Sequence, residues 1–150
     1  AVDRSLSFGA SVSEFPLQPE TAAYARSRGM DVCVGAPNVV RGGSHDGNLN
    51  AADTIRAGTA NVLCSDYHPA SLLHAVFALE RLGMPLHAAA AMASLNPARA
   101  VGRADAIGSL EPGKLADLIV VRLIGDIPVV VATIVNGKVV YRANDYFAAD

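Results

Sequence analysis

Short apolar runs alternate with amphipathic segments along the first part of the chain. Apolar runs bounded by Gly and Pro predict three strands, at Gly9–Phe15, Asp31–Val34 and Ala60–Cys64. Apolar residues at helical spacing, with Pro or Gly at the ends, predict three helices, at Pro19–Arg28, Leu49–Ala57 and Pro69–Leu82. Strands that alternate with helices are typical of right-handed crossovers and a parallel sheet. We therefore predict an α/β fold, with Asn38–Asn48 as a long polar loop.

The pattern changes after Gly83. Two further helices are predicted at Pro85–Ala93 and Pro97–Val101, followed by three strands at Asp117–Arg122, Pro128–Val135 and Lys138–Arg142. Asn136-Gly137 joins the last two strands and predicts a two-residue type I′ hairpin turn. The chain therefore ends in a small antiparallel segment.

Composition narrows the class of protein. The chain has 150 residues, 51% of them hydrophobic, with 12 Lys and Arg against 14 Asp and Glu and a net charge of −2. This apolar content predicts a folded core, and the charge balance argues against nucleic acid as a partner. No apolar stretch reaches the roughly 20 residues of a membrane span. We find no signal peptide, and Cys33 and Cys64 are expected to be reduced thiols, so we expect a cytoplasmic protein without a membrane partner.

Two features suggest that the chain is part of a larger protein. It starts at Ala1 rather than at Met. A three-stranded parallel sheet also leaves backbone donors and acceptors exposed at an open edge. We therefore expect a C-terminal piece of a larger β/α protein, and pairing of exposed edges would give a homo-oligomer.

Asp66 is the strongest candidate for chemistry. It follows an apolar strand and begins a loop between a strand and a helix, where active sites collect in β/α folds. A carboxylate there can bind a metal ion or accept a proton. The alternative is that Asp66 caps the following helix, and the position alone does not separate the two.

The glycine-rich segment 35–48 is the second candidate. It contributes Asn38, Arg41, Ser44 and His45 after a strand end, and Arg offers a planar fork for phosphate oxygens. The segment does not have the spacing of a nucleotide-binding P-loop, and a mobile surface loop is the alternative.

Two further residues belong to the same predicted rim. Glu14 closes the first strand and is a possible metal ligand, and His68 is a possible substrate contact. Polar groups at three successive strand ends predict convergence on one site. Two function classes remain open: a metal-dependent hydrolase centred on Asp66, and a non-catalytic α/β interaction module.

Three later segments resemble the amidohydrolase superfamily: 94–99 (Ser-Leu-Asn-Pro-Ala-Arg), 108–121, with its Pro-Gly-Lys-Leu-Ala-Asp motif, and 131–140. The resemblance implies a (β/α)8 barrel beside a small β-sandwich. It assigns about barrel strands six to eight, with their packing helices, to residues 1–106, and part of the sandwich to residues 107–150. It also implies that Asp66 is the metal-linked acid/base of a divalent metal enzyme using zinc, manganese or iron.

Segments 13–16, 35–45 and 65–73 resemble more specifically a member of that superfamily acting in phosphonate metabolism. This implies a small phosphorylated ribose substrate and release of pyrophosphate, with a cyclic amide or imide as the alternative substrate. Most metal ligands of the superfamily have no counterpart in this chain. We therefore expect residues 1–150 alone to bind metal poorly and not to turn over.

Overall fold

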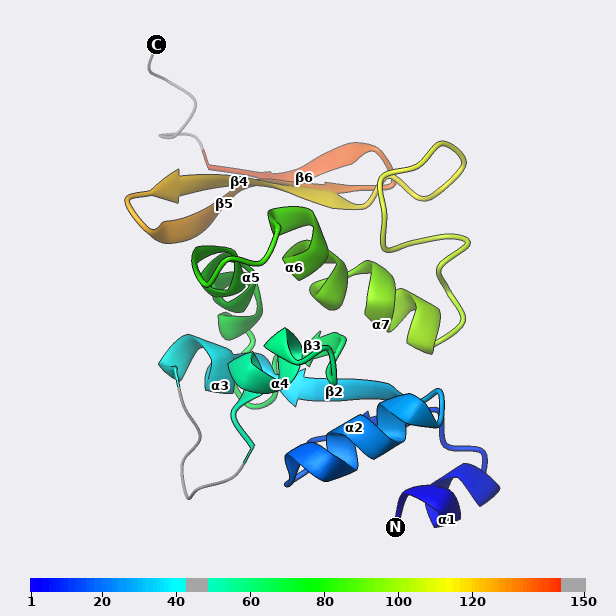
Figure 1. Cartoon of the computed structure of the whole chain (residues 1–150). Coiled ribbons are helices and arrows are strands. Elements are labelled where there is room, and N and C mark those ends of the chain that lie inside the picture. The colour runs from blue at the N-terminus through cyan, green and yellow to red at the C-terminus, as the bar shows by residue number, and fades with distance from the viewer. Residues whose placement is uncertain (43–48, 144–150) are drawn as a thin grey trace.

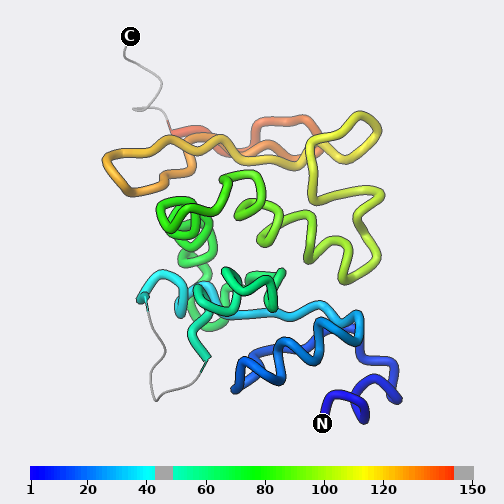
Figure 2. Tube along the Cα trace, viewed as in Figure 1, coloured from blue at the N-terminus to red at the C-terminus, as the bar shows by residue number. Residues whose placement is uncertain are grey.

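The computed structural model describes residues 1–42 and 49–143 as two sheets separated by helices (Figures 1 and 2). The strands are β1 Val12–Glu14, β2 Asp31–Gly35, β3 Val62–Cys64, β4 Leu118–Ile124, β5 Ile127–Val135 and β6 Lys138–Arg142. The helices are α1 Val2–Ser7, α2 Pro19–Ser27, α3 Ala36–Arg41, α4 Ala51–Arg56, α5 Ser71–Arg81, α6 Leu86–Ala93 and α7 Leu95–Ala100.

The first sheet is parallel, as predicted, with the strand order β1-β2-β3. Val12 pairs with Asp31, and Cys33 pairs with Val62. The three carboxyl ends therefore lie at the same edge of the sheet. In the part of the chain that the structure describes, β1 and β3 each pair on one side only.

The second sheet is an antiparallel meander, β4-β5-β6, also as predicted. The turn between β5 and β6 has Asn136 at φ 49° and Gly137 at φ 74°, the two positive angles that a type I′ turn requires. In Figure 1 this sheet lies above α5, α6 and α7, which separate it from the parallel sheet. Helix α5 contacts β5, whereas α6 and α7 contact β3.

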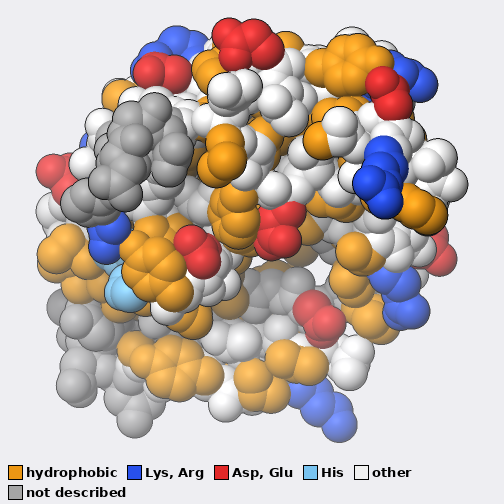
Figure 3. Space-filling view, turned by 90° about the horizontal axis from the view of Figure 1, so that it is seen from below, with side chains coloured by type: hydrophobic (Ala, Val, Ile, Leu, Met, Phe, Trp, Pro, Cys, Tyr) orange, Lys and Arg blue, Asp and Glu red, His pale blue; other side chains and the backbone are white. Residues whose placement is uncertain are grey.

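The main core lies between the parallel sheet and its helices. Val32 and Val34 are almost completely buried and pack with residues of α2, α4, α5 and α6. Met30 and Met92 are among the largest fully buried side chains. Many other hydrophobic side chains remain exposed, and Figure 3 shows them interspersed with charged groups on the face seen from below.

Two helices differ from the sequence prediction. Helix α1 was not expected before the first strand. The predicted loop Asn38–Asn48 is wrong for its first part, because Asn38–Arg41 belongs to α3. Pro37 fits the first turn of α3, Val39 is buried in the core, and Gly42 ends the helix at φ 75°. Residues 43–48 lie outside the described part of the chain.

Both cysteines are free thiols; Cys33 is buried and Cys64 is partly buried. None of the helices in residues 1–42 and 49–143 is long and apolar enough to cross a membrane.

Candidate functional site

The carboxyl ends of the parallel strands bring three backbone positions together. Phe15 follows β1, Gly35 ends β2, and Asp66 lies two residues beyond β3. A Cβ atom built on Gly35 would lie 3.2 Å from Cε1 of Phe15 and 3.6 Å from Oδ2 of Asp66. The Asp66 carboxylate therefore lies against the carboxyl end of β2, next to Phe15.

Phe15 and Asp66 share an unusual backbone conformation. Phe15 has φ 47° and Asp66 has φ 50°, in the left-handed region that non-glycine residues rarely adopt. The backbone N–H of Phe15 donates to the carbonyl of Cys33 at 3.0 Å, which ties it to β2. Such strained residues cluster at functional sites, where surrounding structure holds them in place.

The structure separates the two interpretations of Asp66. Helix α5 begins at Ser71, its N-cap residue is Ala70, and no side-chain cap hydrogen bond is present there. The Asp66 side chain is exposed and forms no hydrogen bond or ion pair with any described residue. Capping is therefore excluded, and the carboxylate is available at the strand end.

Arg41, at the end of α3, contacts the loop after β3 that carries Asp66. It is the last residue of α3, and its guanidinium carbon lies 5.6 Å from the centre of the Tyr67 ring. This distance is within the range of a cation–π interaction. The end of α3 therefore contacts the loop that carries Asp66, although Arg41 and Asp66 form no direct ion pair.

The remaining predicted residues have different surroundings. Asn38 uses its side chain on backbone: Oδ1 accepts from the N–H of Ala51 at 3.2 Å, and Nδ2 lies 3.5 Å from the carbonyl oxygen of Leu49. Glu14 is exposed at the end of β1. Asn38 therefore anchors the chain that returns into α4.

The main chain of His68 shapes the loop after β3. Its N–H donates to the carbonyl of Ser65, and its own carbonyl accepts from both the N–H and the Oγ of Ser71. The imidazole itself is exposed. Ser44 and His45 lie outside the described residues.

The thiols of Cys33 and Cys64 lie close to each other below this rim. Cys33 pairs in register with Glu14, and Cys64 pairs with Gly35 on the same sheet face. Burial, with smaller contributions from Cys64 and Glu14, raises the pKa of Cys33 to about 12. Cys33 is therefore protonated and poorly nucleophilic near neutral pH.

Metal binding needs more ligands than this rim provides. Among residues 1–42 and 49–143, no group of three His, Cys, Asp or Glu side chains is placed to hold a metal ion. Asp66 and Glu14 could each supply an oxygen ligand, but they do not complete a site with the other described residues.

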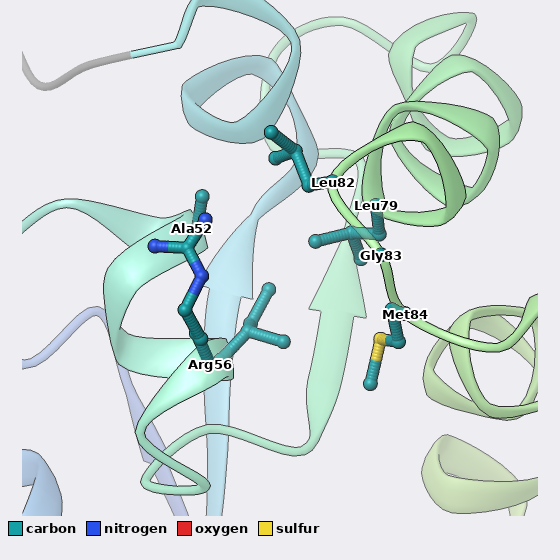
Figure 4. A pocket seen from close by; sticks show the side chains of 7 residues that line it. Ala52, Arg56, Leu79, Leu82, Gly83 and Met84 are labelled. Atoms are coloured by element: carbon teal, nitrogen blue, oxygen red, sulfur yellow. The ribbon is translucent and has the colours of Figure 1, made fainter.

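A separate hollow of about 300 Å³ lies between α4 and the end of α5 (Figure 4). Leu79, Met84 and Arg56 are among its lining residues. The Arg56 guanidinium forms an ion pair with Asp53 at 2.7 Å. The hollow includes none of the predicted site residues.

The comparison with known families gives the class of protein. The amidohydrolase family profile matches residues 17–140, and the chain belongs to this family. An amidohydrolase crystal structure from Thermotoga maritima MSB8 superposes with a TM-score of 0.72 at 22% identity, covering 95% of this chain and 40% of that one.

Curated proteins of known name are also similar to this chain. The Escherichia coli K12 alpha-D-ribose 1-methylphosphonate 5-triphosphate diphosphatase is 42% identical over 123 residues, which covers 79% of this chain and 32% of that enzyme. An imidazolonepropionase from Porphyromonas gingivalis is 45% identical over 78 residues, covering 48% of this chain and 18% of that protein. The chain thus spans about a third, or less, of the length of these relatives.

Several features could not be found from the sequence pattern. The positive φ angles of Phe15 and Asp66 and the contact between Arg41 and Tyr67 depend on how separate strands are placed. Helix α3 did have a local signal, because Pro near its start and Gly after its end are typical helix boundaries.

Proposed function

We propose that the protein is a metal-dependent hydrolase that releases pyrophosphate from α-D-ribose 1-methylphosphonate 5-triphosphate. The single observation that carries the site is the Asp66 carboxylate beyond the end of β3, which lies beside Gly35 and has no partner among the described residues. The substrate follows from the 42% identity with the Escherichia coli diphosphatase.

The proposal includes an architecture. Strands β1, β2 and β3 are assigned to about the sixth, seventh and eighth strands of a (β/α)8 barrel within residues 1–106. Strands β4–β6 are assigned to a small β-sandwich within residues 107–150. Catalytic groups in such barrels lie at the carboxyl ends of the strands, which is where Asp66 stands. For residues 1–150 by themselves, the edges of β1 and β3 that pair with no described strand support association into a homo-oligomer.

The reaction divides into proton transfer and charge binding. A water oxygen attacks the α-phosphorus, the bond from that phosphorus to the bridging oxygen breaks, and pyrophosphate leaves with the bonding electrons. Asp66 accepts the proton that the water loses. Arg41 donates N–H groups to phosphate oxygens, and the exposed imidazole of His68 lies on the same loop as Asp66. Ser44 and His45 remain proposed phosphate contacts from the sequence.

A divalent ion would lower the pKa of the attacking water and offset negative charge on the phosphate. The described residues of this chain do not form a complete site for such an ion. The proposal gives this chain the proton acceptor and the polyphosphate contacts. Asp66 and Glu14 stay candidate ligands that need further donors.

The test is pyrophosphate release from the triphosphate substrate by the full-length protein, with and without a chelator. We expect chelator-sensitive release, and a fall in kcat of about 10²-fold or more for Asp66→Asn. Asp105→Asn is the matched control, because Asp105 is also exposed and lies on a surface turn far along the chain from the strand ends. A folded, metal-loaded protein that releases no pyrophosphate would refute the proposal.

A cyclic amide or imide is the second candidate substrate. The matches to imidazolonepropionases favour it, and a carboxylate at the position of Asp66 could serve C–N hydrolysis equally well. The Arg41 fork favours phosphate instead. Ring opening of an imidazolone without any pyrophosphate release would select this second candidate.

A further inference from the structure

Two arginines in the described structure lie within cation–π range of tyrosine rings, and they differ in how their charge is matched by other groups. Arg28 lies 5.7 Å from the ring centre of Tyr24, and Arg41 lies 5.6 Å from that of Tyr67. The first pair joins residues one helical turn apart at the end of α2. The second joins α3 to the loop after β3, so it links two elements at the candidate site.

The charge of Arg28 is already matched. Its guanidinium forms an ion pair with Asp3 and donates to the Tyr24 hydroxyl at 2.9 Å. The Tyr24 hydroxyl also donates to the Asp3 carboxylate at 3.0 Å. This cluster is complete within the chain and ties α1 to α2.

The charge of Arg41 is not matched in the same way. Among the described residues, no carboxylate or carbonyl oxygen accepts a hydrogen bond from its guanidinium. The Tyr67 ring lies within cation–π range of the guanidinium, a contact that does not use its N–H donors. An arginine placed by an aromatic ring, with no hydrogen-bond acceptor among the described residues, can offer its planar fork of N–H groups to phosphate oxygens.

The position of Asp66 gives a reason for the contact between Arg41 and Tyr67. Asp66 directly precedes Tyr67, and its carboxylate is also unpaired among the described residues. A direct ion pair between Arg41 and Asp66 would neutralise both groups and occupy the proton acceptor. Contact with the aromatic ring holds the cation nearby without using the carboxylate.

We propose that Tyr67 is a positioning residue that holds the Arg41 guanidinium by cation–π contact, so that its free N–H groups bind the polyphosphate of the substrate. The inference rests on the proposed function, because it names the groups that recognise that substrate class. It assigns Tyr67 to binding through Arg41 rather than to the chemical step.

The first measurement is calorimetric binding of inorganic tripolyphosphate to the chelator-treated, full-length protein. Replacing Tyr67 by Leu removes the π face, and we expect Kd to rise about two- to fivefold, the range typical of an exposed cation–π pair. Tyr67→Phe keeps the face and should bind like the wild type. Tyr67→Gln, which has a polar side chain without a π face, is a second variant in case Tyr67→Leu folds poorly. Tyr24→Leu is the matched control and should leave Kd unchanged.

Two further comparisons test the route through Arg41. Tyr67→Leu should add no loss of affinity in an Arg41→Ala background, because the group it positions is then absent. In steady-state kinetics Tyr67→Leu should raise KM for the triphosphate substrate by a similar factor and leave kcat within about twofold of the wild type.

The outcomes distinguish the inference from the proposed function. An active wild type whose Tyr67→Leu and Tyr67→Gln variants keep wild-type Kd and KM would overturn the inference alone. So would an undiminished effect of Tyr67→Leu in the Arg41→Ala background, or failure of the wild-type protein to bind tripolyphosphate. If the wild type releases no pyrophosphate but its tripolyphosphate affinity still depends on Tyr67 and Arg41, the proposed reaction fails and the anion site stands.

Discussion

Asn61 joins the amino ends of β2 and β3, and replacing it by Asp gives a sharp test of the fold. Its Oδ1 accepts from the N–H of Val32 at 2.9 Å, and its Nδ2 donates to Oδ1 of Asp31 at 2.6 Å. The same Asp31 oxygen lies 3.3 Å from Nη1 of Arg26. The Asn61 carbonyl accepts from Nδ2 of Asn96 at 2.8 Å. Through its side chain and its backbone carbonyl, Asn61 thus connects β2, the start of β3 and α7.

Asn61→Asp keeps the shape and the acceptor for Val32 but replaces the donor with a second carboxylate oxygen. Two unit charges 2.6 Å apart repel by about 6 kcal/mol at an effective dielectric constant of about 20. Rearrangement of the side chains and the positive charge of Arg26 reduce this repulsion, whereas loss of the hydrogen bond to Asp31 adds to the cost. We expect the free energy of unfolding to fall by roughly 2–4 kcal/mol at pH 7.5.

The loss should depend on pH in a definite direction. Repulsion raises the pKa of the introduced carboxyl in the folded state above its unfolded value of about 3.9. A protonated carboxyl can donate to Asp31 in place of the amide, so the variant should approach wild-type stability near pH 4.5. The deficit should then grow as pH rises through the raised folded pKa.

Urea unfolding of the wild-type and variant proteins at pH 4.5, 6 and 7.5 measures this difference. Asn50→Asp is the matched control, because Asn50 caps α4 with its side-chain oxygen and Asp caps equally well. Its effect should stay within about 0.5 kcal/mol at all three pH values. A deficit of equal size at pH 4.5 and 7.5, or none at either, would refute the contact with Asp31.

Two further predictions concern the site. Gly35→Ala would place its Cβ 3.2 Å from Phe15 and 3.6 Å from Asp66, so we expect kcat to fall about tenfold while the unfolding free energy changes by less than about 2 kcal/mol. Kinetics and urea unfolding on the same samples measure both quantities, and an unchanged kcat would contradict the prediction. Because the pKa of Cys33 is raised to about 12, iodoacetamide at pH 8 should alkylate the less buried Cys64 first, and Cys33 should react only on unfolding. Peptide mass spectrometry follows both cysteines, and equal labelling rates in the folded protein would count against the raised pKa of Cys33.

The fold was largely predictable because its strongest signals are local. Pro19 at the start of α2 and the Asn136-Gly137 turn each fix nearby backbone angles, and the structure places both as predicted. Glycine-rich composition led to the wrong prediction for the start of segment 38–48. The burial of Val39 against the core, which stabilises α3, depends on contacts far along the chain.

The candidate site was predictable in part. Asp66 could be placed at a strand end from the apolar run before it, but the sequence left open whether its side chain caps the following helix. That distinction required the start of α5 at Ser71. The contact between Arg41 and Tyr67 could not be predicted, because it depends on how α3 and the loop after β3 are placed relative to each other.

The two ends of the parallel sheet differ in how well their polar groups are satisfied. At the amino end, the amide of Asn61 finds a partner for both its donor and its acceptor, which stabilises the strand pairing. At the carboxyl end, Phe15 and Asp66 adopt strained backbone angles, and the Asp66 and Arg41 charges have no matching group among the described residues. Strain and unmatched charge lower stability unless a ligand or a reaction uses them. Their concentration at the carboxyl end, while the amino end carries the satisfied network, is the strongest structural reason to place binding and chemistry there.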